Sequence, residues 1–190
     1  MGVGALTMRR AVFLDRDGVL NRAVVRHGRP RPPSSVEDVE LYEGTREACT
    51  VLRSAGFVLI VVSNQPDVAR GTQRRDTVET INAYLQTALP LDDIRVCYHD
   101  DQDACGCRKP APGLLLEAAG TWQIALDRSF MVGDRWRDIE AGRRAGCLTV
   151  FIDQGYAEPQ PCQPDFRARS LAEAADWILT HSSTRGGDAL

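Results

Sequence analysis

The stretch AVFLDRDG, residues 11–18, decides the fold. It begins with a short, continuous apolar run, which is typical of a strand buried on both faces of a sheet. Asp15, Arg16, Asp17 and Gly18 follow this run directly. In open α/β sheets, ligands bind beyond the carboxyl ends of the strands. We therefore expect a parallel sheet with a ligand site that begins at residue 15.

Similar apolar runs recur along the chain and alternate with helical patterns. Further strands are expected at 57–63, 94–99, 129–134 and 148–152, and helices within 45–56, 74–89, 112–120, 136–146 and 170–179. This alternation predicts an α/β fold, a three-layer Rossmann-like parallel sheet with helices on both faces. The segments 21–43 and 153–169 are expected to be irregular loops.

Length, charge and hydropathy restrict the class of protein. A chain of 190 residues fits a single domain over 1–190, with frayed ends at about 1–9 and 182–190. The net charge of −3 gives no electrostatic reason to expect binding to nucleic acid. The longest apolar run, 57–62, is too short to cross a bilayer, and the N-terminus lacks the pattern of a signal peptide. These features predict a cytoplasmic protein with no membrane partner, and they leave its oligomeric state open.

Polar side chains suited to a metal ion and a phosphate group follow several of the expected strands. They are Asp15, Asp17, Ser63, Asn64, Gln65, Asp134 and Asp138, with Arg108 and Lys109 in the turn before another helix. An isolated aspartate after a strand is more often a helix cap or a turn residue, and an isolated lysine is more often a surface charge. Their shared position at one edge of one sheet favours a binding site instead.

The chemistry of these groups suggests their roles. Carboxylate oxygens suit Mg²⁺, so Asp15 and Asp134 are expected to bind it. Phosphoryl transfer needs positioning and charge neutralisation, which the metal, Lys109 and the Ser63 hydroxyl would provide. Asp15 and Asp17, two positions apart, can divide the roles of nucleophile and general acid. Lys109 is the only lysine among 23 basic residues, which also suggests a specific role.

Four segments resemble the motifs of the haloacid dehalogenase superfamily: FLDRDGVLN, VVSNQ, RKPAPG and VGDRWRD, in that order. The resemblance implies a Mg²⁺-dependent phosphomonoester hydrolase in which Asp15 becomes an aspartyl phosphate. Asp17 would protonate the leaving oxygen, then activate water, and also give Mg²⁺ its backbone carbonyl. Ser63 and Lys109 would hold the phosphoryl group. Predicted substrate contacts are Asn64, Gln65, Arg108 and Arg135, with Asp138 in a supporting role. The stretches between motifs leave no room for a separate cap domain.

A second metal site is expected beside the first. Cys97-x-His99, a gap of five residues and Cys105-x-Cys107 offer three sulfurs and one nitrogen, the set of a closed structural Zn²⁺ site. For Cys97 and His99 alone, a core residue and a turn residue would be the simpler interpretation. Four such groups within eleven residues favour zinc, which would stabilise a loop of little intrinsic structure. The cysteines without spaced partners, expected to be core or incidental thiols, are Cys49, Cys147 and Cys162.

The zinc loop narrows the resemblance to one branch. CxHx₅CxCRKP is similar to the branch that contains the D-glycero-D-manno-heptose 1,7-bisphosphate 7-phosphatases and the phosphatase domain of histidinol-phosphatase proteins. NQPDVARG and the arginine-rich stretch 26–31 are more similar to the heptose group, although AVVR at 23–26 departs from it. A sugar bisphosphate is therefore the expected substrate. Histidinol phosphate, a phosphotransferase or mutase reaction through the same aspartyl phosphate, and a non-catalytic zinc-stabilised module stay open as alternatives.

Overall fold

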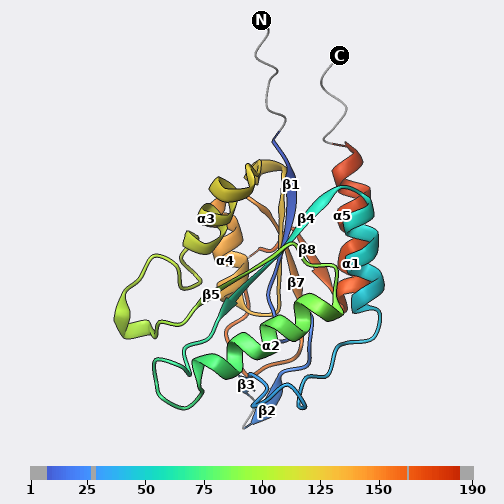
Figure 1. Cartoon of the computed structure of the whole chain (residues 1–190). Helices are drawn as coiled ribbons and strands as arrows, with labels where there is room; N and C mark the ends of the chain where they lie inside the picture. Colours follow the sequence, from blue (N-terminus) through green and yellow to red (C-terminus); the bar gives the residue numbers. More distant parts are fainter. Residues whose placement is uncertain (1–7, 27–28, 162, 185–190) are drawn as a thin grey trace, which may run out of the picture.

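The structure, a computed structural model, describes residues 8–26, 29–161 and 163–184. Six strands form one parallel sheet in the order β5-β4-β1-β6-β7-β8 (Figure 1). Their bounds are Arg10–Leu14 for β1, Phe57–Asn64 for β4, Asp93–Cys97 for β5, Phe130–Gly133 for β6, Leu148–Ile152 for β7 and Phe166–Ala168 for β8. The expected parallel α/β sheet is confirmed, and β1 lies inside it, between β4 and β6.

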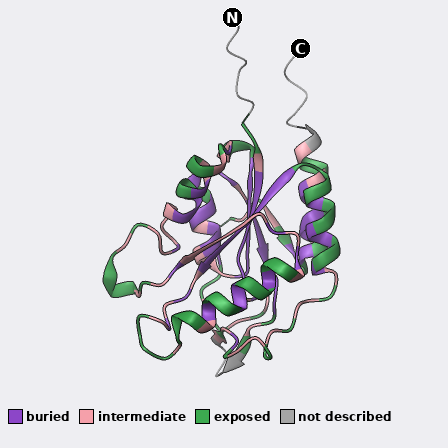
Figure 2. Cartoon of the chain, in the orientation of Figure 1, coloured by how far each residue is buried: buried purple, intermediate pink, exposed green. Residues whose placement is uncertain are grey.

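Helices cover both faces of this sheet. The helices α1 (Thr45–Ser54), α2 (Arg75–Ala88) and α5 (Leu171–Thr184) share one hydrophobic core with it, and α3 (Gly113–Trp122) and α4 (Trp136–Ala145) share the other. Successive strand residues point to opposite faces. Val12 and Leu14 therefore pack into the first core, while Ala11 and Phe13 pack into the second. Figure 2 shows the result, a buried sheet between helices whose outer faces are exposed.

Two segments expected to be irregular contain short strands. Residues 166–168 form β8, which extends the sheet beside β7. Within 21–43, the strands β2 (Val24–Arg26) and β3 (Arg29–Arg31) pair as an antiparallel hairpin. Strands of three residues are too short to show a periodic pattern, so the sequence does not indicate them.

Both ends of the described chain are more ordered than expected. The backbone N–H of Arg9 donates to the Gln123 carbonyl at 2.8 Å, and the Arg9 carbonyl accepts from Ala125 at 2.9 Å. Residues 182–184 belong to the last turn of α5. The remaining parts of the expected frayed ends, 1–7 and 185–190, lie outside the described residues.

The cysteines without spaced partners agree with the sequence analysis as far as the structure describes them. Cys49 and Cys147 are buried, as expected of core thiols, and Cys162 lies outside the described residues. In the described ranges, no helix is both long and apolar enough to cross a membrane.

The parallel sheet brings the predicted site residues to one edge. Asp15 follows β1, Ser63 lies near the end of β4, and Asp134 follows β6. The β2–β3 hairpin lies at the same end of the molecule, at the bottom of Figure 1. In the described part of the chain, this hairpin and the neighbouring loops border the edge, and no separate cap domain is present there.

Candidate active site

Lys109 lies at the centre of the site and is buried. Its Nζ is 2.6 Å from Asp15 Oδ1, 2.6 Å from Asp138 Oδ1 and 2.6 Å from the Val62 carbonyl oxygen. An ammonium group has three hydrogens, so each has its own acceptor. Burial acts to lower the pKa of Lys109, but the charges of Asp138 and Asp15 outweigh it and raise the pKa. The group therefore remains a cation between two carboxylates.

The neighbours of Lys109 fix its position. The Asn64 side chain accepts from the Lys109 backbone N–H at 3.1 Å and donates to the Lys109 carbonyl at 2.9 Å. Sequence reasoning assigned Asn64 to the substrate, whereas the structure turns its amide to the backbone of Lys109. Asp138 is held at the start of α4, where its Oδ2 accepts from the Arg135 backbone N–H at 3.0 Å. Gly133 permits this packing, because a Cβ there would lie 2.1 Å from the Asp138 Cβ.

Asp15, Asp134 and Asp138 form a cluster suited to a metal ion. Each offers a carboxylate oxygen, and these atoms lie within 4.8 Å of one another. The pKa of Asp134 is raised well above its usual value, mainly by burial and further by the neighbouring carboxylates. Burial likewise raises the pKa of Asp15 to about 6, against the opposing charge of Lys109. Three carboxylates with one ammonium leave a formal charge of −2, which matches a hard divalent cation such as Mg²⁺.

Gly18 makes room for Asp134. Its φ of +99° lies in the left-handed region, and a Cβ there would lie 1.8 Å from Asp134 Oδ2. The Gly18 carbonyl accepts from Gln154 Nε2 at 2.7 Å, and the same Cβ would lie 3.0 Å from the Tyr156 hydroxyl. The loop after β7, which contains Gln154 and Tyr156, therefore borders the metal cluster. Sequence reasoning missed both residues, since they lie in a segment with no recognisable pattern.

Asp17 is held by donors from three sides. Its carboxylate accepts from Arg16 Nη2 at 2.8 Å, from Asn21 Nδ2 at 2.9 Å and from Gln65 Nε2 at 2.8 Å. Gln65 Nε2 also donates to Ser63 Oγ at 2.9 Å, so one amide joins the predicted acid and the predicted phosphate ligand. The contacts of Arg16 and Asn21 with Asp17 were not predicted. An arginine between two aspartates has the pattern of a solvated charge, and nothing in the sequence marks Asn21 as a partner of Asp17.

A cleft of about 450 Å³ opens over these groups. Its lining includes Asp15, Asp17, Ser63, Asn64, Gln65, Lys109 and five arginines, Arg31, Arg70, Arg108, Arg135 and Arg137. Arg135 forms a two-point ion pair with Glu158, at 2.7 and 2.5 Å. Arg108 Nε donates to Asp101 Oδ1 at 2.9 Å. The mouth of the cleft is therefore bordered by arginines held by acidic partners.

Buried polar atoms without partners gather around this cleft. Within the described ranges, the buried side-chain N and O atoms that lack a hydrogen bond are Asn21 Oδ1, Gln65 Oε1, Arg108 Nη1 and both oxygens of Asp134. Such atoms are paired in most proteins, because an unpaired buried polar group is costly. Their concentration here fits a site that receives a ligand and a cation. The Asp134 oxygens in particular suit a metal.

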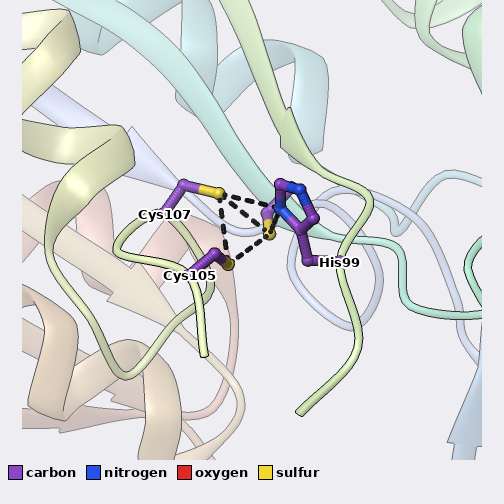
Figure 3. Close-up of side chains that lie close together, drawn as sticks. His99, Cys105 and Cys107 are labelled. Atoms are coloured by element: carbon purple, nitrogen blue, oxygen red, sulfur yellow. Dashed lines mark hydrogen bonds between the residues drawn. The ribbon is translucent and has the colours of Figure 1, made fainter. Parts of the chain in front are cut away.

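The second predicted cluster also converges. Figure 3 shows His99, Cys105 and Cys107 pointing toward a common centre. The Cys97 sulfur lies 3.7 Å from that of Cys105 and 3.1 Å from that of Cys107, with 3.5 Å between the last two. His99 Nδ1 lies 3.5 Å from the Cys97 sulfur and 3.4 Å from the Cys107 sulfur. A tetrahedral Zn²⁺ with Zn–S bonds of about 2.3 Å places its sulfurs about 3.8 Å apart, so the cluster could hold zinc.

The loop that carries this cluster packs against the start of α3. The Gly113 N–H donates to the Gly106 carbonyl at 3.0 Å, and a Cβ at Gly113 would lie 2.3 Å from that oxygen. Cys107 is followed directly by Arg108 and Lys109. The thiol cluster and the buried ammonium therefore sit on one short, closely packed segment.

Comparison with known proteins identifies the family. A model described as HAD-hydrolase-like matches residues 106–174. The D-glycero-beta-D-manno-heptose-1,7-bisphosphate 7-phosphatase of Helicobacter pylori (strain J99) is 38% identical over 181 residues, covering 91% of this chain and 99% of that protein. The chain therefore belongs to the haloacid dehalogenase-like family, and it is a phosphatase.

Other relatives and solved structures agree. The D-glycero-D-manno-heptose-1,7-bisphosphate 7-phosphatase of Thermosynechococcus vestitus is 34% identical over 200 residues, covering 93% of this chain and 99% of that protein. The crystal structure of the D,D-heptose 1,7-bisphosphate phosphatase of B. bronchiseptica, complexed with magnesium and phosphate, gives a TM-score of 0.75 at 27% identity, covering 90% of this chain and 99% of that chain. A HAD-like phosphatase structure from Mesorhizobium loti gives 0.73 at 28% identity, covering 96% and 90%.

Gly18→Ala is expected to disable the site. The alanine methyl group would collide with Asp134 and displace its carboxylate. Disturbing the support of a metal ligand in this way typically lowers metal affinity or activity by about 10- to 100-fold. Gly56→Ala is the matched control, because Gly56 has a φ of +87° with nothing within 4 Å of a Cβ. Both variants should lose roughly 1–2 kcal/mol of stability through left-handed strain, and Gly18→Ala should lose more because its methyl group also displaces Asp134. Mg²⁺ titrations of phosphatase activity in which both variants behave alike would contradict this role of Gly18.

Proposed function

We propose that this protein is the phosphatase that removes the 7-phosphate of D-glycero-D-manno-heptose 1,7-bisphosphate. The observation that carries the proposal is the buried Lys109 ammonium, bonded to the carboxylate that follows β1 and adjoining an arginine-lined cleft. The names of the relatives favour this substrate over histidinol phosphate. A bisphosphate also suits the arginines of the mouth, since their planar fork matches a second phosphate group.

The reaction proceeds through Asp15 in two steps. In the first, an Asp15 oxygen attacks the phosphorus, the bond to the sugar oxygen breaks, and Asp17 gives that oxygen a proton. In the second, Asp17 takes a proton from water as the water attacks the aspartyl phosphate, which releases phosphate and restores Asp15. Lys109 and the Ser63 hydroxyl neutralise and orient the transferred group.

The residues that would hold Mg²⁺ are Asp15 and Asp134, with the backbone carbonyl of Asp17. Both Asp134 oxygens are buried and lack a hydrogen bond of standard geometry, with the Tyr156 hydroxyl nearby, which fits this role. When bound, Mg²⁺ supplies neutralisation of the charge that gathers on the phosphoryl oxygens. Asp138 supports the site by holding Lys109 at 2.6 Å.

A panel of phosphate esters tests the proposal. We expect the highest kcat/KM with an anomer of heptose 1,7-bisphosphate, and lower values with histidinol phosphate, hexose phosphates and p-nitrophenyl phosphate. Asp15→Asn keeps the shape of the side chain but removes the nucleophile, so turnover should fall by about 10⁴ or more. Faster hydrolysis of histidinol phosphate would refute the substrate, and near-normal turnover by Asp15→Asn would refute the nucleophile.

We also propose that the thiol cluster holds a structural zinc ion in a cytoplasmic, reducing setting, where its thiols stay free of disulfides. Burial acts to raise the pKa of the Cys105 thiol, but hydrogen bonds from the backbone at Arg108 and from the other thiols lower it to about 7. That shift favours the thiolate of Cys105, whereas burial raises the pKa values of Cys97 and Cys107. A bound cation would favour the thiolate form of all three, which is the form that binds metal.

Metal analysis of protein purified without chelators should find about one zinc ion per chain. Cys105→Ser should lower both the zinc content and the Tm, because the loop loses the ion that holds it. Cys147→Ala removes a thiol outside the cluster and should keep the zinc. Preparations that contain well under one ion per chain, or full zinc retention by Cys105→Ser, would refute the site.

We propose that the guanidinium of Arg108 binds the phosphate group of the bisphosphate that is not transferred. Its side chain is only 10% exposed, Nε is bonded to Asp101, and Nη1 is buried without a partner beside the cleft. A charge-assisted hydrogen bond contributes about 1.5–3 kcal/mol, so Arg108→Ala should lower kcat/KM for the bisphosphate by about 10- to 150-fold. An aryl phosphate has no second phosphate and should be affected much less.

Asp101→Asn separates this role from bracing of the zinc loop. It weakens the ion pairs of Asp101 with Arg108 and Arg137 but keeps the Arg108 guanidinium in the protein. If Arg108 only stabilises the loop, Asp101→Asn should lower kcat/KM as much as Arg108→Ala does. Arg108→Ala should then also lower kcat/KM for the bisphosphate and for the aryl phosphate by the same factor.

A further inference from the structure

Arg16 carries a charge in the interior of the protein. Its side chain is 0% exposed, although it lies between the two aspartates of the active-site turn. A buried charge is tolerated when its hydrogen bonds are made, and those of Arg16 go to two residues. Nε and Nη2 donate to the Asp17 carboxylate, with the shortest contact at 2.8 Å, and Nη1 donates to Asn82 Oδ1 at 3.0 Å.

This geometry joins α2 to the active site. Asn82 lies on α2, is buried, and is 66 positions from Arg16 in the sequence. The guanidinium is planar and rigid, so fixing one nitrogen on Asn82 fixes the direction of the other two. Those two nitrogens donate to the Asp17 carboxylate as a pair. A two-point contact of this kind fixes the plane of the carboxylate as well as its distance from the guanidinium.

The remaining partners of Asp17 constrain it less. Asn21 and Gln65 each contribute one hydrogen bond from a neutral amide, at 2.9 and 2.8 Å. A charged, two-point contact is stronger and more directional than either. The orientation of the Asp17 carboxylate therefore depends mainly on the Arg16 fork, which is held in place by Asn82.

We propose that Asn82 and Arg16 are positioning residues that aim Asp17 at the leaving oxygen of the substrate. The inference rests on the proposed role of Asp17 as general acid. Neither residue lines the catalytic cleft, so they act through Asp17 and not on the substrate. General acid catalysis depends on close alignment of donor and acceptor, and its contribution is typically about 10²- to 10⁴-fold.

The leaving group supplies a selective readout. When the bond to a sugar oxygen breaks, the departing alkoxide needs the proton of Asp17. A p-nitrophenolate is stable without that proton, so its departure does not depend on the acid. The ratio kcat/KM reports the steps up to formation of the aspartyl phosphate, before Asp17 acts as base. A misaligned acid should therefore lower kcat/KM for alkyl phosphates and leave that for p-nitrophenyl phosphate nearly unchanged.

The decisive variants differ at one position of α2. Asn82→Leu keeps the approximate size but removes the oxygen acceptor, and it should lower kcat/KM for the best alkyl phosphate of the panel by about 10- to 100-fold. Asn82→Asp keeps an acceptor for Arg16 and should retain the selectivity of the unchanged protein. Gln86→Leu, an exposed position one turn along α2, controls for the polar-to-apolar change. Circular dichroism and Tm establish that each variant folds.

Two further variants keep the result interpretable. If Asn82→Leu does not fold, Arg16→Lys replaces it, because lysine keeps the charge but cannot form the fork, and the same selective loss is expected. Asp17→Asn must itself show the selective loss. If Asp17→Asn lowers kcat/KM for alkyl phosphates and for p-nitrophenyl phosphate by the same factor, the acid role of Asp17 is refuted. If Asp17→Asn behaves as expected while Asn82→Leu harms both ester types equally, or neither, the positioning role is overturned.

Discussion

Three buried carboxylates lie close together at the end of the central strands, and two of them share one ammonium group. Lys109 is bonded to Asp15 and Asp138, while Asp134 lies beside them and, of the described side chains, interacts with the Tyr156 hydroxyl. Burial raises the pKa values of Asp15 and Asp134, and the neighbouring carboxylates add to the effect because the cluster holds more negative than positive charge. A divalent cation would neutralise that charge, so the ion proposed for the chemistry would also stabilise the buried cluster.

The surroundings of the site repeat one physical device, an arginine fixed by an acidic or amide partner. Arg16 is held by Asn82, Arg108 by Asp101 and Arg135 by Glu158. Arginine is well suited to this, because its fork can bind a fixed partner with some of its nitrogens and present the others elsewhere. The described residues form no cap domain over the cleft, so the fixed arginines Arg108 and Arg135 give its lining a defined arrangement without one.

The sequence predicted the parallel sheet and the meeting of Asp15, Ser63, Lys109 and Asp134, because parallel strands end at one edge. The convergence of the cluster Cys97, His99, Cys105 and Cys107 was predictable from the sequence, because all four groups lie within eleven residues. Hydrogen-bond partners were not predictable: Asn64 binds the backbone of Lys109, and Arg16 reaches Asn82 across 66 positions. Such choices depend on the packing of α2 and the loops, which leaves no periodic signal. Strand β8 was missed because three residues show no alternation.

The central ion pair joins residues 94 positions apart, and the fork of Arg16 joins residues 66 positions apart. Contacts this distant in sequence cost considerable loop-closure entropy and form only as the chain nears its final topology. In a partly folded chain, Asp15 therefore does not lie beside Lys109, and Arg16 does not orient Asp17. Catalytic competence is in this sense a property of the completed fold, and during synthesis it arises only after the segment that carries Asp134 and Asp138 has joined the sheet.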